Sequence, residues 1–353
     1  MAFTVRKTPV SHGKRPCRAG TPYDERTVSS LRWSLPLATL IAALYGLFMG
    51  ALFSSRFQIF NGTGASSAVM GAAFLIGMPV ALGFLSVYVY ESAGHRSWLI
   101  RALGPWLAAL LSVIIALAIG WEGMICIVMW LPLFLSLASL GGLAAGLLRD
   151  YNEANKRHMT LVFCLILPLL LAPVEQRFPA AARVRVVETE IQIDAPRQVV
   201  WRNIKSVDAI QPEEQTYTWT QRIGFPRPIA ATLSAEGVGG VRRATFAGGV
   251  VFHETVTEWQ PPVHLAFTIR ADTAAIPATT LDRHVTIGGA YFDVLDGDYR
   301  IVELGPRRVL LRLVSRHRLS TRLNPYAALW TGAILRDIQN NILGVIKRRS
   351  ERS

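Results

Sequence analysis

A basic stretch near the C-terminus, SRHRLSTRLNPYAALW (residues 315–330), contains the side chain best suited to acid–base chemistry. His317 lies there among three arginines, Arg316, Arg318 and Arg322. Because an imidazole titrates near neutral pH, His317 could exchange a proton with a substrate or hydrogen-bond a bound ligand. It could also be a structural histidine whose hydrogen bonds are satisfied within the fold, and the sequence leaves both interpretations open.

Period-two alternation along this predicted strand separates its inward from its outward side chains. His317 shares a face with the apolar Leu311 and Leu313, whereas the three arginines take the other face. We therefore expect His317 to point into the interior of a domain and the arginines to face solvent or lipid headgroups. The assignment depends on the strand register, since a slip of one residue would reverse it.

A second candidate is Glu254, which lies on a central predicted strand. It shares a face with the apolar Phe252 and Val256, which favours an inward position. An unpaired carboxylate in the interior is costly, so an inward Glu254 needs a partner. Arg242 or Arg300 could supply it. Glu254 is then either half of a structural ion pair or an acid–base group.

The segment 281–301, LDRHVTIGGAYFDVLDGDYRI, is long for a connection between two strands. Long ordered loops over a cavity often serve as lids or contact a ligand. Its triplet Asp296-Gly297-Asp298 could simply form a turn. The candidate catalytic residues are therefore His317, Glu254 and Asp293, and the candidate ligand-binding residues are His317, Glu254, His284, Tyr291 and Trp330.

The sequence lacks the motifs of several well-known kinds of active site. It has no catalytic-triad order, phosphate-binding loop or dinucleotide fingerprint. Cys17, Cys126 and Cys164 lie far apart and form no metal-ligand spacing. We therefore expect no metal and no cofactor. We also expect no nucleic-acid partner, because aromatic side chains do not alternate with the basic ones.

The overall composition is typical of a membrane protein. Of 353 residues, 51% are hydrophobic and only 17% are charged, and the mean hydropathy is +0.31. A helix needs roughly 17–25 apolar residues to cross a bilayer. After a basic tail over residues 1–32, we predict an α-helical transmembrane domain over residues 33–176, with five spans at 36–53, 68–90, 103–120, 124–148 and 159–174.

The basic residues predict how this domain is oriented. Lysines and arginines are frequent in the N-terminal tail and in the second and fourth connections, whereas the first and third carry only Arg56. By the positive-inside rule the N-terminus is cytoplasmic. With five spans, the chain is a multi-pass protein of a bacterial inner membrane and the residues after Val174 are periplasmic. If the fifth run, which contains Pro168, lies along the membrane instead, the C-terminal domain is cytoplasmic.

Local features of the apolar runs concern packing and chemistry. Glycines recur at spacing four, as Gly46 and Gly50 and as Gly142 and Gly146, which permits close approach of helices. Glu122 lies in a very tight turn between the third and fourth runs. A carboxylate at membrane depth would suggest a ligand or proton role, whereas a carboxylate at a turn is solvated, and both interpretations stay open.

From about residue 180 the pattern changes to alternation, which is typical of a sheet. A strand at 187–193 is followed by a helix at 194–204, which Asp194 can cap. Further strands are predicted at 230–236, 241–247, 250–259, 265–271, 299–304 and 309–319. A long amphipathic helix at about 326–348 follows. Its predicted apolar stripe consists of Tyr326, Leu329, Trp330, Ala333, Ile334, Ile338, Ile342, Val345 and Ile346.

Three segments of this half resemble a known group of proteins. They are IQIDAPRQVVWRNI (191–204), GVGGVRRATFAGGVVFHETVTEWQPPVHLAFTI (237–269) and SRHRLSTRLNPYAALW with the helix after it. From Val186 onward the chain resembles the polyketide cyclase/dehydrase and lipid-transport superfamily, also named START-like or SRPBCC. The resemblance implies an α+β helix-grip domain over residues 180–353, in which an antiparallel sheet curves around the long C-terminal helix and leaves a cavity.

The resemblance says little about activity, because that superfamily includes carriers, sensors, cyclases and hydrolases without a shared catalytic set. We expect a START-like domain that binds a hydrophobic small molecule or a membrane lipid at the bilayer surface, and not an enzyme. A cyclase or dehydrase acting on a hydrophobic substrate is the enzymatic alternative. A membrane-tethered sensor or scaffold is the third possibility, and the sequence does not indicate the oligomeric state.

Overall fold

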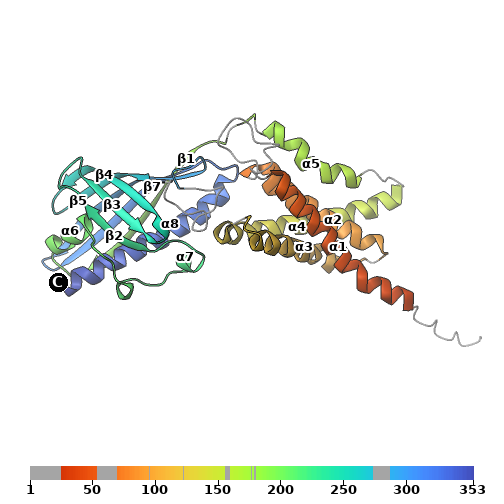
Figure 1. Ribbon diagram of the computed structural model, residues 1–353, viewed down its shortest axis with the longest axis horizontal. Coiled ribbons are helices and arrows are strands. Elements are labelled where there is room, and N and C mark those ends of the chain that lie inside the picture. The colour runs from red at the N-terminus through yellow and green to blue at the C-terminus, as the bar shows by residue number, and fades with distance from the viewer. Residues whose placement is uncertain are drawn as a thin grey trace, which may run out of the picture.

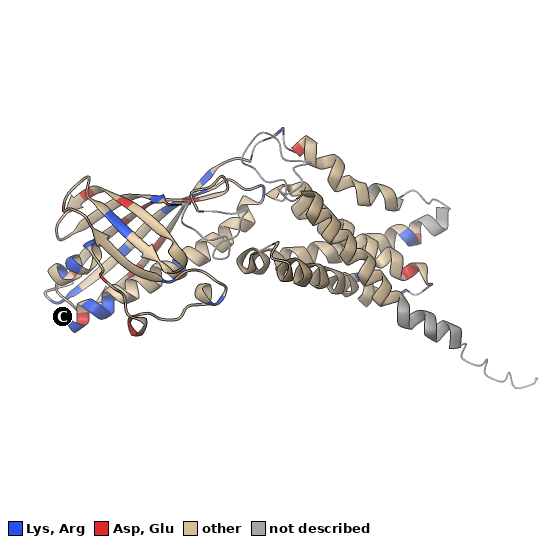
Figure 2. Cartoon of the chain, viewed as in Figure 1, with Lys and Arg blue, Asp and Glu red and all other residues tan. Residues whose placement is uncertain are grey.

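The computed structural model describes residues 25–53, 70–94, 96–121, 123–155, 160–175, 177–178, 180–272 and 287–353. A helical bundle is followed by a curved sheet that wraps a long helix (Figure 1). Charged side chains are scarce in the bundle and frequent in the sheet domain (Figure 2). The bundle consists of α1 (Glu25–Phe53), the π-helical turn η2 (Ala73–Gly77), α2 (Met78–Ser92), α3 (Trp98–Ala118), α4 (Met124–Asn155) and α5 (Thr160–Glu175).

Four stretches of the bundle are long and apolar enough to cross a membrane, namely Ser34–Phe53, Ala73–Ser92, Trp98–Ala118 and Met124–Tyr151. The fifth predicted run forms a helix, α5, but with 16 residues (Thr160–Glu175) it is slightly shorter than the roughly 17 residues that a span requires. The described residues therefore contain four candidate spans, where the sequence predicts five. The stretch Ala73–Ser92, which contains α2, lies at the centre of the bundle. In its most apolar part 67% of the residues are buried, whereas in the other three candidate spans the share is 28% or less.

The backbones of α2 and α4 approach each other very closely at two glycines. A Cβ atom at Gly83 would lie 1.9 Å from the carbonyl oxygen of Ala138. A Cβ atom at Gly141 would lie 2.0 Å from the carbonyl oxygen of Val80. Only glycine leaves room for this approach, which maximises van der Waals contact between two apolar helices.

A charged cluster joins three helices at the end of the bundle remote from the sheet domain. Arg101 of α3 donates from Nε to Glu91 of α2 over 2.5 Å, and from Nη1 to Asp150 of α4 over 2.8 Å. Glu91 and Arg101 are buried. Pairing makes the burial of these charges tolerable and fixes the ends of α2, α3 and α4 relative to one another.

The second half contains one seven-stranded antiparallel sheet with the order β1-β7-β6-β5-β4-β3-β2. The first strand therefore pairs with the last, and the other strands follow one another as a meander. The elements are β1 (Arg183–Ile193), α6 (Arg197–Lys205), η3 (Pro212–Glu214), α7 (Trp219–Arg222), β2 (Pro228–Leu233), β3 (Val241–Phe246), η4 (Ala247–Gly249), β4 (Val251–Gln260), β5 (His264–Ala271), β6 (Phe292–Gly305), β7 (Arg308–Leu319) and α8 (Asn324–Arg352).

α8 lies against one face of the sheet, which we name the inner face. The core between them is apolar and includes Val256, Leu265, Phe267, Leu311, Leu313, Leu343 and Ile346. α6 covers one end of this core, where Trp201 meets Trp259 edge to face at 5.1 Å. A curved antiparallel sheet that wraps a long C-terminal helix fits a START-like helix-grip domain, as the resemblance implies.

β6 is longer than predicted, and this corrects the interpretation of segment 281–301. The strand begins at Phe292, so Asp296-Gly297-Asp298 is not a turn but pairs with β7. Gly297 is required by packing instead, because a Cβ atom there would lie 2.7 Å from the Phe267 ring. The chain accommodates the change of register with a bulge between Val294 and Asp296.

The predicted apolar stripe of α8 is wrong in its first turns. Leu329 is 72% exposed and Ala333 is also exposed, whereas Ile334, Val345 and Ile346 are buried as predicted. The first turn of α8 also reaches the bundle, where the Tyr326 hydroxyl donates to the Met129 carbonyl of α4 over 2.5 Å. The stripe predicted for sheet packing therefore begins only about two turns into the helix.

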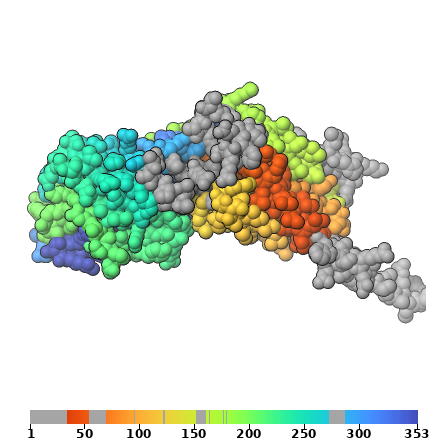
Figure 3. All heavy atoms as spheres, viewed as in Figure 1, coloured from red at the N-terminus to blue at the C-terminus, as the bar shows by residue number. Residues whose placement is uncertain are grey.

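The two halves are also joined by an ion pair. Arg322, just before α8, lies 3.0 Å from the Glu175 carboxylate and donates to the carbonyl oxygens of Glu175 and Phe178. The same carboxylate accepts the backbone N–H groups of Ala72 and Ala73 at the start of η2, over 2.6 and 2.8 Å. Arg322 was predicted to face solvent or lipid headgroups, but it instead joins the sheet domain to the end of α5. In the space-filling view the two halves adjoin each other (Figure 3).

Candidate functional site

The inner face carries a buried ion pair between Arg242 of β3 and Glu254 of β4. The two residues are direct neighbours in the strand register, and the guanidinium donates to the Glu254 carboxylate. They are only 4% and 7% exposed. Of the two partners that the sequence offers for Glu254, the structure therefore selects Arg242. Arg300 instead pairs with Asp298.

Aromatic rings surround this pair. The Arg242 guanidinium lies 5.6 Å from the centre of the Phe267 ring, and Phe267 in turn lies 6.1 Å from Tyr299. Burial raises the pKa of Tyr299 to about 12, so its hydroxyl stays protonated. The buried Nε of Arg242 has no hydrogen-bond partner among the described residues. A hydrogen-bond acceptor on a ligand would satisfy it.

A polar network in which the hydrogen bonds are satisfied joins α8 to β1 and β7. Gln339 accepts from the Thr189 hydroxyl over 3.0 Å and donates to the Ser315 hydroxyl over 2.9 Å. All three residues are buried. This network was not predicted from the sequence, because Gln339 lies outside the predicted apolar stripe of α8.

His317 lies on the inner face, 1% exposed, where the alternation of β7 predicts it. Its Nε2 is 3.1 Å from the Thr331 hydroxyl of α8, and Phe292 packs beside its ring at 5.9 Å. Its Nδ1 has no partner in the described part of the chain. Burial, and to a smaller extent the charge of Arg185, lower the pKa of His317, so the imidazole is neutral at physiological pH.

This burial makes a prediction about pH. Because the unfolded chain binds the proton of His317 more tightly than the folded chain, the folded state should lose stability as the pH falls below about 6.5. We expect His317→Gln to reduce that loss, measured as the change in thermal unfolding temperature of the detergent-solubilised chain with pH. His253→Gln, at an exposed position on β4, is the matched control. Equal effects of the two substitutions would contradict the assignment.

The remaining candidates do not gather around His317. Asp293 pairs in register with Arg318 and so takes the outer face of β6, where burial raises its pKa. Tyr291 is buried and Trp330 is half-buried on α8. His284 and Glu122 lie outside the described residues. Within the described ranges, Glu254 and His317 share the inner face, but β5 and β6 separate their strands.

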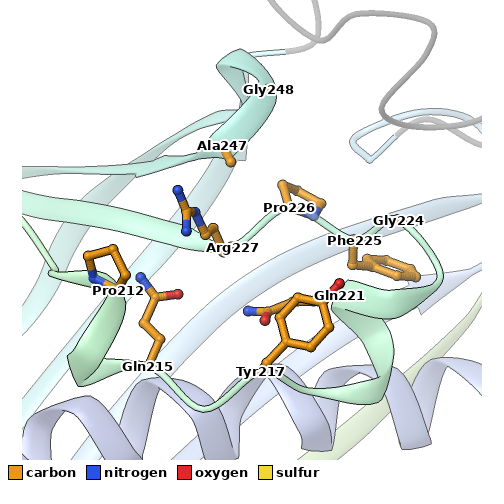
Figure 4. Close-up of a pocket in the computed structure, with 10 residues that line it drawn as sticks. All are labelled: Pro212, Gln215, Tyr217, Gln221, Gly224, Phe225, Pro226, Arg227, Ala247 and Gly248. Carbon is orange, nitrogen blue, oxygen red and sulfur yellow. The ribbon is translucent and has the colours of Figure 1, made fainter.

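A pocket of about 630 Å³ lies between the segment 212–227 and the β3–β4 turn at Ala247 and Gly248 (Figure 4). Such a volume is in the range of small-molecule sites. It is lined by Pro212, Gln215, Tyr217, Gln221, Gly224, Phe225, Pro226, Arg227, Ala247 and Gly248. Aromatic, proline and small side chains dominate this lining, with two amides and one arginine among them. None of these lining residues is among the candidates predicted from the sequence.

The pocket also has a buried polar atom. Gln215 donates from Nε2 to the Pro228 carbonyl over 2.9 Å, while its Oε1 is buried without a partner among the described residues. The pocket lies beside the bundle, because a Cβ atom at Gly224 would lie 3.8 Å from Cγ1 of Ile125, in the first turn of α4. A ligand in this pocket would therefore lie close to the candidate spans.

Comparisons with known proteins give fold neighbours at low similarity. No protein-family model matches the chain, and no curated protein matches it. A START superfamily protein from Mycobacterium smegmatis is 14% identical, with a TM-score of 0.31 over 47% of this chain and 97% of that one. The Zhui aromatase/cyclase from Streptomyces sp. R1128 is 16% identical, with a TM-score of 0.29 over 48% and 96%. Norcoclaurine synthase from Thalictrum flavum, in complex with dopamine and hydroxybenzaldehyde, is 10% identical, with a TM-score of 0.29 over 47% and 86%.

Proposed function

We propose that this chain is a membrane protein whose START-like domain binds a hydrophobic small molecule or lipid, taken up close to the bilayer. The observation that carries the proposal is the position of the pocket. It is largely apolar, it has a small-molecule volume, and its wall at Gly224 lies beside the first turn of α4, a candidate membrane span. A ligand from the bilayer would have the shortest path to a pocket placed there.

Polar atoms inside the domain suggest that the ligand has a hydrogen-bonding group. Three buried side chains have a polar atom without a partner among the described residues, namely Nε of Arg242, Nδ1 of His317 and Oδ1 of Asn341. Arg242 and Asn341 lie on facing surfaces, because Ala244, two residues along β3, packs with Val345, one turn along α8. Unsatisfied groups of this kind are costly unless water or a ligand completes them. The pocket lining holds another such atom, Oε1 of Gln215, so an apolar molecule with one hydrogen-bond donor would suit the pocket.

The orientation in the membrane is part of the proposal. The start of α1 lies at one end of the bundle and the sheet domain at the other (Figure 1). With the basic tail in the cytoplasm, the sheet domain is periplasmic in a Gram-negative bacterium. α5 supports this orientation although it is short, because it returns the chain to the end of the bundle where Glu175 meets Arg322.

A cyclase or dehydrase reaction is the second candidate, and His317 is the observation in its favour. A neutral, buried imidazole with a free nitrogen could take a proton from a substrate. Glu254 is engaged by Arg242, and Asp293 lies on the outer face, so neither supplies a partner acid. Substrate turnover that His317→Gln abolishes, with ligand binding retained, would establish this second function.

The test of the binding function is native mass spectrometry of the full chain released from detergent micelles. We expect an apolar molecule to remain bound to the wild-type chain. Ala247→Trp should lower its occupancy, because the indole fills the pocket. Ala235→Trp, at an exposed turn at the other end of β2, is the matched control and should leave occupancy unchanged. A wild-type chain without ligand, or equal occupancy in both variants, would contradict the proposal.

A further inference from the structure

We infer that one surface of the sheet domain binds the headgroup region of an anionic bilayer and brings the pocket to the lipid. This surface, which we name the interfacial surface, consists of Tyr217, Trp219, Arg222, Arg227 and Leu329. The inference rests on the proposed function, because it takes the bundle to be embedded in that bilayer. It adds the lipid class and the residues that contact it.

The position of α8 along the length of the bundle shows how far this surface lies from the candidate spans. Tyr326 bonds to the carbonyl of Met129, which lies five residues after the start of α4. At 1.5 Å per residue, that carbonyl is about 7.5 Å along the candidate span. The first turn of α8 therefore lies beside the outer turns of a membrane helix. Leu329 follows on the next turn and is 72% exposed, although it is a large apolar side chain.

The segment 212–227 reaches the same end of the bundle, since Gly224 lies beside Ile125. α7 is held against α8 by the Thr220 hydroxyl, which donates to Asp337 over 2.5 Å. On this segment Tyr217 is 67% exposed and Trp219 is 39% exposed. Tyrosine and tryptophan prefer the membrane–water interface, where the ring contacts acyl chains and the polar atom stays hydrated. Exposed aromatic rings beside the end of a span therefore fit lipid headgroups better than bulk water.

The charges of the surface select the lipid class. Arg222 and Arg227 are both exposed, and the Arg222 guanidinium lies 5.8 Å from the centre of the Tyr217 ring. The carboxylate of Asp337 lies beside α7, where it accepts a hydrogen bond from the Thr220 hydroxyl. Basic residues at a membrane surface are attracted to anionic headgroups. Because Arg227 also lines the pocket, a headgroup bound there would lie at the mouth of the site.

The test measures the depth of a spin label in the full chain. Cys17, Cys126 and Cys164 are replaced by alanine, and a nitroxide is attached at Tyr217→Cys in nanodiscs containing phosphatidylglycerol. We expect the label to collide more with oxygen, which partitions into lipid, than with a water-soluble nickel chelate. Val238→Cys is the matched control, because Val238 is 70% exposed in the β2–β3 turn remote from the bundle. The inference would be overturned if the label at 217 were as accessible to the nickel chelate as the label at 238, or if it were inaccessible to both oxygen and the chelate.

A second pair of variants tests the lipid class. Arg222→Glu should shift the label at 217 toward the nickel chelate in phosphatidylglycerol, and less so in phosphatidylcholine alone. Arg202→Glu, at an exposed position on α6, should cause no shift. No effect of Arg222→Glu would overturn the anionic preference. A water-exposed Tyr217 combined with a ligand that still co-purifies would refute the interfacial surface and leave the binding function standing.

Discussion

Glu254→Ala is expected to destabilise the sheet domain by about 3–5 kcal/mol, the usual cost of removing one member of a buried ion pair. The substitution would leave the Arg242 guanidinium 4% exposed and without the carboxylate that accepts its hydrogen bond. Hydrogen exchange of the β3 and β4 amides in the full chain would measure the loss, since it reports local opening free energies. Thermal unfolding would give a second measure.

Two controls separate the buried charge from other causes. Arg242→Met combined with Glu254→Leu should recover most of the stability, because apolar groups often replace a buried ion pair at little cost. Glu236→Ala removes the partner of Lys205 in an exposed pair and should cost at most about 1 kcal/mol. A Glu254→Ala chain as stable as the Glu236→Ala chain would show that the pair is not buried.

Gly83→Ala should disrupt the bundle more than an ordinary overpacking substitution, which costs about 1–3 kcal/mol. The new methyl group would lie 1.9 Å from the Ala138 carbonyl oxygen, so α2 and α4 would have to move apart along their whole contact. The atom in the way belongs to a backbone carbonyl group, which cannot move aside by changing rotamer as a side chain can. We expect a lower yield of monodisperse protein in size-exclusion chromatography and a lower thermal unfolding temperature.

Gly50→Ala is the matched control for that substitution. It lies in α1, and the nearest atom to its Cβ position is a ring carbon of Trp121 at 4.0 Å, an ordinary contact. This substitution should leave yield and unfolding temperature near those of the wild-type chain. If Gly83→Ala behaved like Gly50→Ala, the close crossing of α2 and α4 would be refuted.

Local patterns in the sequence were enough to predict the order of the elements and the inner face of β7. Alternation places His317 inward because each residue of a strand faces opposite to its neighbours, and the structure has this register. The need of Glu254 for a basic partner followed from the cost of burying a lone carboxylate, whereas the choice of Arg242 over Arg300 comes from the structure. Both arguments use short-range geometry or a local energy, and neither needs the positions of distant segments.

Features that depend on distant contacts could not be predicted. Gly297 looks like a turn residue beside two aspartates, whereas its role is to make room for Phe267 on another strand. Leu329 fits the apolar stripe of α8, but it is 72% exposed in a part of the helix that also contacts α4. The pocket is formed by a segment without periodicity against the turn at Ala247, so no spacing in the sequence indicates it.

The most direct test of ligand binding in the pocket is photo-crosslinking in the membrane of the living cell. A benzophenone amino acid would replace Gln215, whose side chain lines the pocket, or Val238 at the remote exposed turn. After irradiation and purification of the full chain, mass spectrometry should find a covalent adduct with an apolar molecule at position 215 and none at 238. Irradiated chains without an adduct at 215, or with the same adducts at both positions, would contradict the proposal that this domain binds a hydrophobic ligand.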